Sequence, residues 1–165
     1  MPPDEAAIAA AILVSAAAIE RFIDALWIED GLAPLTLAAY RRDLTLYADW
    51  LAAHAGRAID ATTEADLLAC ITHRHAETRA TTANRRLTVF KRYFRWALRE
   101  HLLTSDPTLR LLSARQALRV PKSLSEAQVE ALLAAPDDGV PLGLRDRAMI
   151  ELMYASGLRV SELVL

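Results

Sequence analysis

The sequence predicts an all-α protein, and two observations lead to this fold class. Leucine and alanine recur at spacings of three and four residues, the period of an α-helix, along most of the 165 residues. Only 5 glycines and 7 prolines are present, and the alternating valine, isoleucine and threonine of β-strands are nearly absent. Apolar residues make up 53% of the chain and charged residues 24%, which is enough apolar material for a packed core.

The first 101 residues predict four helices joined by short connections. The first helix begins at about Glu5 or at about Ser15 and ends at Glu29, because Asp30-Gly31 follows. Its expected apolar stripe consists of Ile19, Phe22, Ile23, Leu26 and Trp27. The other three helices are expected over residues 35–54, 63–76 and 81–101. Together the four predict a compact antiparallel bundle.

A second helical unit is expected after residue 124. Residues 101–124 contain an Asp106-Pro107 turn and a Val120-Pro121 break, which are typical of an inter-domain linker. Ser125 and the Gln128 that follows it form a capping-box pattern, which predicts a helix to about residue 135. Further helices are expected over residues 142–155 and from about residue 157.

The charge is distributed unevenly along the chain. The net charge is −2, which by itself argues against a nucleic-acid partner. Residues 1–72 hold 4 Lys/Arg and 11 Asp/Glu, whereas residues 73–101 hold 8 and 2, and residues 102–165 hold 7 and 8. The positive charge is therefore concentrated in one segment of 29 residues, which includes the fourth expected helix.

The fourth expected helix carries a row of arginines. Arg85, Thr88, Arg92, Arg95 and Arg99 repeat at spacings of three and four, away from the apolar face. Such a row is either a solvated surface or a phosphate-binding face. Only one acidic residue, Glu100, lies within residues 78–101, so few charge partners are available on the same helix.

Two further groups of polar residues favour DNA binding. The fourth helix begins with small hydrogen-bonding side chains suited to base edges or phosphates, namely Thr81, Thr82 and Asn84. The second helix adds a group that lies outside its apolar seam, namely Arg41, Arg42 and Thr45. Two basic helices on one bundle fit a major-groove reader, and we expect duplex DNA as the partner.

Metal and membrane sites are not expected. Cys70, His73 and His75 lie close in sequence, but a closed zinc site needs four ligands. As the single cysteine, Cys70 permits no internal disulfide, which suits a cytoplasmic location. The longest uncharged stretch, residues 6–19, is too short to span a bilayer, and it follows an acidic start that differs from a signal peptide.

The hydroxyl of each of the four tyrosines could in principle act as a nucleophile. Each of the four has apolar neighbours on its own helix, so core packing is expected for Tyr40, Tyr47, Tyr93 and Tyr154.

Arg159 is the most unusual charged residue near the C-terminus. It follows Gly157-Leu158 at the start of an apolar helix, with Glu162 three residues further on. The arginine either pairs with Glu162 on the helix surface or adds to a positive potential that stabilises a phosphate. The residues alone leave both interpretations open.

Four sequence segments resemble the Xer-type tyrosine recombinases. They are IERFIDALWIEDGLAPLTLAAYRRDL (19–44), ANRRLTVFKRYFRWALRE (83–100), PKSLSEAQVEALLAAP (121–136) and LRDRAMIELMYASGLRVSEL (144–163). The resemblance covers about residues 17–164. It implies a SAM-like core-binding helical domain over 17–102, a linker over 103–121 and the helical start of a catalytic domain over 122–165, after an alanine-rich extension at 1–16.

The resemblance also implies a function. Members of this family break and rejoin duplex DNA at specific sites, without metal or cofactor, through a tyrosine that attacks a phosphate. Arg159 matches the first catalytic arginine and Glu162 the acidic residue that orients it. The tyrosine nucleophile and the other catalytic residues would lie beyond Leu165, so these 165 residues are expected to bind duplex DNA without cleaving it.

The implied partners are DNA and other recombinase subunits. Family members act in chromosome partition and cell division as homo- or hetero-tetramers on DNA, with a second recombinase subunit. The alternative is a non-catalytic interaction module that binds an acidic protein or an intact recombinase.

Overall fold

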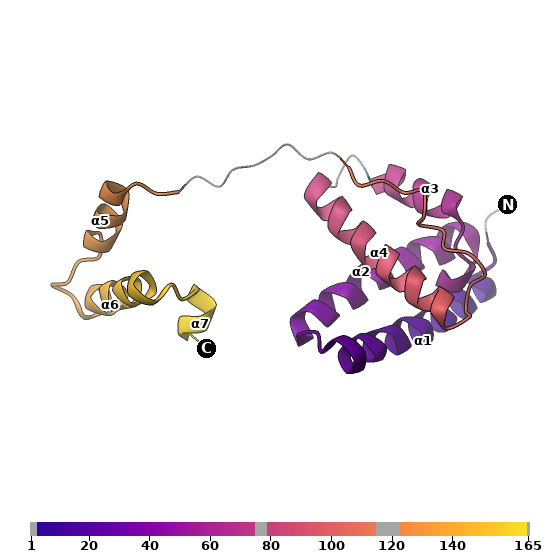
Figure 1. The fold of residues 1–165 in the computed structure, drawn as a ribbon, viewed down its shortest axis with the longest axis horizontal. Helices are drawn as coiled ribbons and strands as arrows, with labels where there is room; N and C mark the ends of the chain where they lie inside the picture. The colour runs from indigo at the N-terminus through magenta and orange to yellow at the C-terminus, as the bar shows by residue number, and fades with distance from the viewer. Residues whose placement is uncertain (1–2, 75–78, 115–122, 165) are drawn as a thin grey trace. The chain divides into compact units, whose positions relative to one another are not determined.

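The computed structural model describes residues 3–74, 79–114 and 123–164, and Figure 1 shows their helices. The chain divides into two compact units, Met1–Ala117 and Leu118–Leu165. The first unit contains α1 (Glu5–Asp30), α2 (Pro34–Ala55), the short 3-10 helix η1 (Ile59–Ala61), α3 (Glu64–Arg74) and α4 (Ala80–Arg99). The second contains α5 (Glu126–Ala134), α6 (Pro141–Ser156) and α7 (Val160–Val164). The described residues contain no strand, and the all-α prediction is confirmed.

Helix α1 takes the longer of its two expected forms. It begins after Asp4, whose side chain accepts a hydrogen bond from the Ala6 N–H, and it ends at Gly31. Gly31 has φ of 60°, a left-handed conformation that favours glycine and stops the helix. Trp27, expected in the buried stripe, is exposed because it lies at the edge of the face that carries Phe22 and Leu26.

Helix α1 is apolar enough to cross a membrane by length and composition, with a mean hydropathy of 1.9 over its best window. The uncharged residues 6–19 were expected to be too short to span a bilayer, but the whole helix of 26 residues is long enough. In this fold the helix instead contributes a face to the core, where Ser15, Ile19 and Phe22 are buried.

The core of the first unit lies where α4 crosses the hairpin formed by α1 and α2 (Figure 1). Phe22 of α1 meets Tyr93 of α4 edge to face, with ring centroids 5.3 Å apart. The apolar seam of α2 repeats at spacings of three and four residues and consists of Leu37, Tyr40, Leu44, Tyr47 and Leu51. Leu44 and Leu51 are fully buried in the same cluster. The apolar seams predicted for α2 and α4 therefore form one core.

The alanine-rich start of the chain belongs to this core as well. Ala11 and Ser15 are buried, and the Ser15 hydroxyl donates to the Ala11 carbonyl at 2.7 Å. The same oxygen accepts a hydrogen bond from the Ile59 N–H at 2.9 Å, which fixes η1 on α1. Residues 1–16 thus include positions that hold the bundle together.

The stretch after α4, residues 102–114, is packed on the first unit, and we call it the strap. Pro107, Thr108 and Leu111 are buried, although they fall in the expected linker. The Asp106 carboxylate accepts bonds from the backbone N–H and the hydroxyl of Thr108. The core of the bundle therefore extends at least to Leu111, while the expected break at Val120-Pro121 lies outside the described residues.

The described residues of the second unit form α5, α6 and α7 and contain no buried core. The capping box predicted at Ser125 and Gln128 is confirmed, with both reciprocal hydrogen bonds present. Helix α6 ends at Gly157, which has φ of 70°. No described side chain of α5, α6 or α7 is buried, so the apolar residues of this unit stay at least partly accessible.

Replacing Ser15 by alanine is expected to destabilise the first unit by about 1–3 kcal/mol. The substitution leaves the buried Ile59 N–H without its acceptor, and an unsatisfied buried donor carries its full desolvation cost. Urea unfolding followed by circular dichroism measures the change. The exposed Ser113 provides a matched Ser→Ala control, and an equal effect of the two substitutions would contradict the role given to Ser15.

Candidate nucleic-acid interface

Helix α4 separates an apolar side from a basic side. Leu87, Phe90 and Phe94 are buried against the other helices of the first unit. The predicted row lies opposite them: Arg85, Thr88, Arg95 and Arg99 are exposed, and Arg92 is half-buried. The row of guanidinium groups is therefore a continuous surface feature of the bundle.

Several arginines of this row form ion pairs with other helices. Arg92 binds Asp30 at the end of α1 at 2.6 Å, and Arg99 binds Glu29 with two bonds of 2.7 and 2.9 Å. The acidic residues that pair with the row are supplied by α1 and α2 as well as by Glu100. The sequence of α4 alone does not reveal these acidic partners, because the contacts depend on the tertiary fold.

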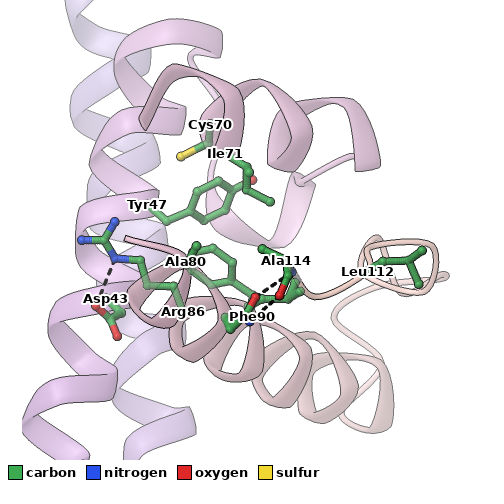
Figure 2. A pocket seen from close by; sticks show the side chains of 12 residues that line it. Asp43, Tyr47, Cys70, Ile71, Ala80, Arg86, Phe90, Leu112 and Ala114 are labelled. Atoms are coloured by element: carbon green, nitrogen blue, oxygen red, sulfur yellow. Dashed lines mark hydrogen bonds and ion pairs between the residues drawn. The ribbon is translucent and has the colours of Figure 1, made fainter. Parts of the chain in front are cut away.

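Asp43 of α2 is the central acidic residue of this surface. Its side chain is only 3% exposed, and the Arg85 guanidinium lies 2.6 Å and 3.0 Å from its two oxygens. The Arg86 Nε atom lies 3.7 Å from the same carboxylate (Figure 2). A buried carboxylate is tolerated only with such compensation, so Asp43 fixes the first half of α4 on α2.

The basic residues of α2 divide into a paired and an unpaired group. Arg41 binds Glu20 of α1 through two bonds of 2.6 and 2.7 Å, and the hydrogen bond from Arg41 lowers the pKa of Glu20. Arg42 and Thr45, which follow Arg41 on α2, are exposed. Among the described residues, Arg42 and Arg95 take part in no ion pair, so their charges are available to a ligand.

The first turns of α4 carry the predicted small polar residues. Thr81 is exposed and Thr82 is partly exposed. The Thr88 hydroxyl donates to the Asn84 carbonyl at 3.0 Å, which leaves its oxygen accessible at the surface. Thr81, Thr82 and Thr88 are therefore all at least partly accessible to solvent.

Asn84 has a partner that the sequence did not suggest. Its amide nitrogen donates to the Ala114 carbonyl at 2.9 Å, and its oxygen accepts from the Ala114 N–H at 2.8 Å (Figure 2). The side chain thereby holds the end of the strap against α4. Contact between Asn84 and a base would require these two bonds to open.

A cavity of about 300 Å³ lies beside this contact, between α2, α3, α4 and the strap. Tyr47, Cys70 and Phe90 form part of its apolar wall, and Asp43 and Arg86 line it as well (Figure 2). Cys70 is buried there, whereas His73 is exposed. His75, the third residue of the rejected metal pattern, lies outside the described residues.

Three of the four tyrosines pack as predicted. Tyr47 and Tyr93 are buried, and burial raises the pKa of both phenols, which keeps them protonated near neutral pH. Tyr40 packs against the core, with the Arg92 guanidinium 5.9 Å from its ring centre. Tyr154 is 68% exposed, so the prediction of core packing was wrong there, because α6 has no buried face.

Arg159 and Glu162 form a local pair at the start of α7. The Arg159 N–H donates to one carboxylate oxygen of Glu162 at 2.8 Å, and its guanidinium binds the other at 2.9 Å. The Arg159 side chain is 81% exposed. Glu162 thus satisfies the backbone at the helix start and sets the direction of the guanidinium.

Two matches to known domains place the chain in a family. Residues 19–101 match the phage integrase N-terminal SAM-like domain, and residues 122–165 match the phage integrase family. The first match alone covers half of the chain. The chain therefore belongs to the phage integrase family, and the predicted SAM-like bundle followed by the start of a catalytic domain is confirmed.

Comparison with individual proteins identifies relatives within this family. The chain is 68% identical over 150 residues to tyrosine recombinase XerD of Ralstonia nicotianae, a match that covers 91% of this chain and 48% of that protein. It is 47% identical to tyrosine recombinase XerD of Yersinia pestis, covering 88% of this chain and 49% of the relative. The Xer-type resemblance is confirmed, and the chain spans about half the length of the curated relatives it matches.

Replacing Asn84 by alanine is expected to release the end of the strap. Without these two hydrogen bonds, amide exchange at Ala114 should be about thirtyfold faster, because each of the two bonds contributes on the order of 1 kcal/mol to local closure. Hydrogen exchange measured by NMR checks this. Thr81→Ala on the same helix is the control, and unchanged protection of Ala114 in the Asn84 variant would contradict the contact.

Proposed function

We propose that the first unit binds duplex DNA for site-specific recombination of the Xer type, the process that resolves chromosome dimers before cell division. The observation that carries this proposal is the exposed row of guanidinium groups on α4, in which Arg95 takes part in no ion pair among the described residues. The unpaired Arg42 on α2 supports the same assignment.

The arrangement suits a duplex better than a small anion. A helix fits the major groove of B-DNA, and cations along its sides neutralise the phosphates on either rim. Arg85, Arg92 and Arg95 would contact phosphates, while the exposed Thr81 and Thr88 are suited to base edges. Arg41, Arg42, Thr45, Thr82 and Asn84 complete the proposed surface.

Arg159 and Glu162 are proposed to belong to the catalytic site. A guanidinium held in direction by a carboxylate can neutralise charge that develops on a phosphate. We propose that residues 1–165 bind DNA and do not cleave it.

The proposed partners are duplex DNA and a second, XerC-like recombinase subunit, in a homo- or hetero-tetramer on DNA in the cytoplasm. A second candidate function is binding to an intact recombinase or to an acidic protein. The observation that favours it is the second unit, where exposed apolar side chains include Leu144, Leu152 and Val160.

Replacing Arg95 by alanine is expected to weaken duplex binding. Removing one phosphate-binding guanidinium should lower the slope of log affinity against log salt concentration by about one. Fluorescence anisotropy with a labelled duplex, titrated at several salt concentrations, measures both quantities. Arg110→Ala is the matched control, since Arg110 is 83% exposed but lies on the strap.

Two results would contradict the proposal. Binding that does not depend on salt would exclude a phosphate-binding surface. Displacement of the duplex from the first unit by an acidic peptide at equal concentration, with Arg95→Ala and Arg110→Ala giving the same affinity, would favour the protein-binding alternative.

A nicked duplex should yield no covalent product with residues 1–165. The reason is that Tyr47 and Tyr93 are buried, Tyr40 packs against the core, and the exposed Tyr154 forms no hydrogen bond with a described residue that could take its proton. A denaturing gel that resolves protein–DNA adducts provides the measurement. An adduct that survives boiling in detergent would contradict the proposal.

A further inference from the structure

Two half-exposed carboxylates hold arginines of the proposed DNA surface. Glu20 of α1 lies 2.6 Å from Arg41, and its side chain is 53% exposed. Asp30, the last residue of α1, lies 2.6 Å from Arg92, and its side chain is 43% exposed. Both acidic residues come from a helix that carries none of the proposed DNA contacts.

These two carboxylates differ physically from Asp43. Asp43 is buried, so breaking its pair with Arg85 would leave a dehydrated charge and is strongly unfavourable. Glu20 and Asp30 are hydrated, and ion pairs of that kind contribute only about 0–1 kcal/mol. A phosphate can therefore replace Glu20 on Arg41, or Asp30 on Arg92, at small cost to the fold.

We propose that Glu20 and Asp30 compete with DNA phosphates for Arg41 and Arg92, and so weaken the phosphate-mediated part of DNA binding. The inference rests on the proposed function. Every phosphate contact made by these arginines has to displace a carboxylate or lie beside one, whatever the DNA sequence. Base contacts by Thr81 and Thr88 involve no such exchange.

The expected size of the effect follows from elementary electrostatics. A carboxylate left about 4 Å from a phosphate is repelled by about 1 kcal/mol in water, which corresponds to about fivefold in affinity. Phosphate contacts are made at every DNA sequence, so the free energy of binding is weakened by the same amount at a preferred site and at any other site. The ratio of the two affinities is set by the base contacts and stays unchanged.

The Glu20 carboxylate stays charged under the conditions of binding. The hydrogen bond from Arg41 lowers the pKa of Glu20, so this carboxylate is ionised at neutral pH. When a phosphate replaces the carboxylate, the freed carboxylate attracts cations, which offsets part of the counterion release from DNA. The pairs should therefore reduce the salt dependence of DNA binding together with the affinity.

The variants Glu20→Gln and Asp30→Asn test the inference because they remove the charge and keep the shape. Glu5→Gln is the matched control: it makes the same charge change on the exposed first turn of α1, and Glu5 takes part in no ion pair among the described residues. Each variant is titrated with a mixed-sequence duplex at several salt concentrations. We expect about a three- to tenfold gain in affinity for Glu20→Gln and for Asp30→Asn, with a steeper salt slope, and less than about a twofold gain for Glu5→Gln.

A selection experiment separates competition for phosphates from a structural effect of the substitutions. Wild-type protein and the two variants each select duplexes from a random-sequence pool, and the enriched pools are sequenced. The variants should enrich a given preferred sequence as strongly as the wild type does, because only phosphate contacts change. Altered enrichment would show that the substitutions move the base-contacting residues, and it would overturn the inference; thermal unfolding should show all three proteins folded.

The outcomes distinguish the inference from the function on which it rests. If the wild type binds duplex DNA with the expected salt dependence, but both variants behave like Glu5→Gln, the competition by Glu20 and Asp30 is overturned and the DNA-binding proposal stands. If the wild type binds no duplex at any salt concentration, the proposed function falls and the inference with it.

Discussion

The ion pair between Asp43 and Arg85 is the interaction on which the proposed DNA surface depends. A carboxylate that is 3% exposed is costly to bury without a close cation, and α4 supplies Arg85 at 2.6 Å and Arg86 at 3.7 Å. The buried pair therefore fixes the rotation of α4 about its own axis relative to α2. Because the arginines of α4 repeat with the helical period, one fixed guanidinium places the whole row on the same side of the bundle.

The other ion pairs hold arginines of the row in place and leave their side chains partly exposed. Arg92 and Arg99 are held by Asp30 and Glu29 at the end of α1, where all the participating side chains remain at least one-third exposed. The surface thus combines a rigid buried anchor, hydrated and exchangeable pairs, and the unpaired Arg95. A net charge of −2 is compatible with a DNA-binding surface for this reason, since the acidic residues of α1 and α2 offset the basic row only in part and at defined positions.

Local patterns in the sequence predicted most of the helices, but the contacts between helices depend on geometry that no local pattern contains. The 3,4 spacing of Leu44, Tyr47 and Leu51 was enough to find the seam of α2, and Asp30-Gly31 marked the end of α1. The pairing of Asp43 with Arg85 joins residues 42 positions apart. For the same reason the sequence predicts only DNA contact for Asn84, although both the nitrogen and the oxygen of its side-chain amide bind Ala114 of the strap. Tyr154 was misjudged because apolar neighbours in sequence indicate burial only where another layer covers the helix.

The first unit is larger than the segment that matches the SAM-like domain, and this bears on how the bundle is held. Residues 19–101 carry the match, yet Ser15 before them binds the Ile59 N–H, and Leu111 after them is buried in the core. Ser15 contacts η1, and the strap lies beside α3 and binds Asn84 at the start of α4 (Figure 1). The flanking segments thus add buried surface and hydrogen bonds to the scaffold while Arg92, Arg95 and Arg99 stay open to solvent. Stability and the proposed ligand binding share Arg85 and Asn84, which bind Asp43 and Ala114 respectively, whereas the charge of Arg95 is used by no ion pair among the described residues.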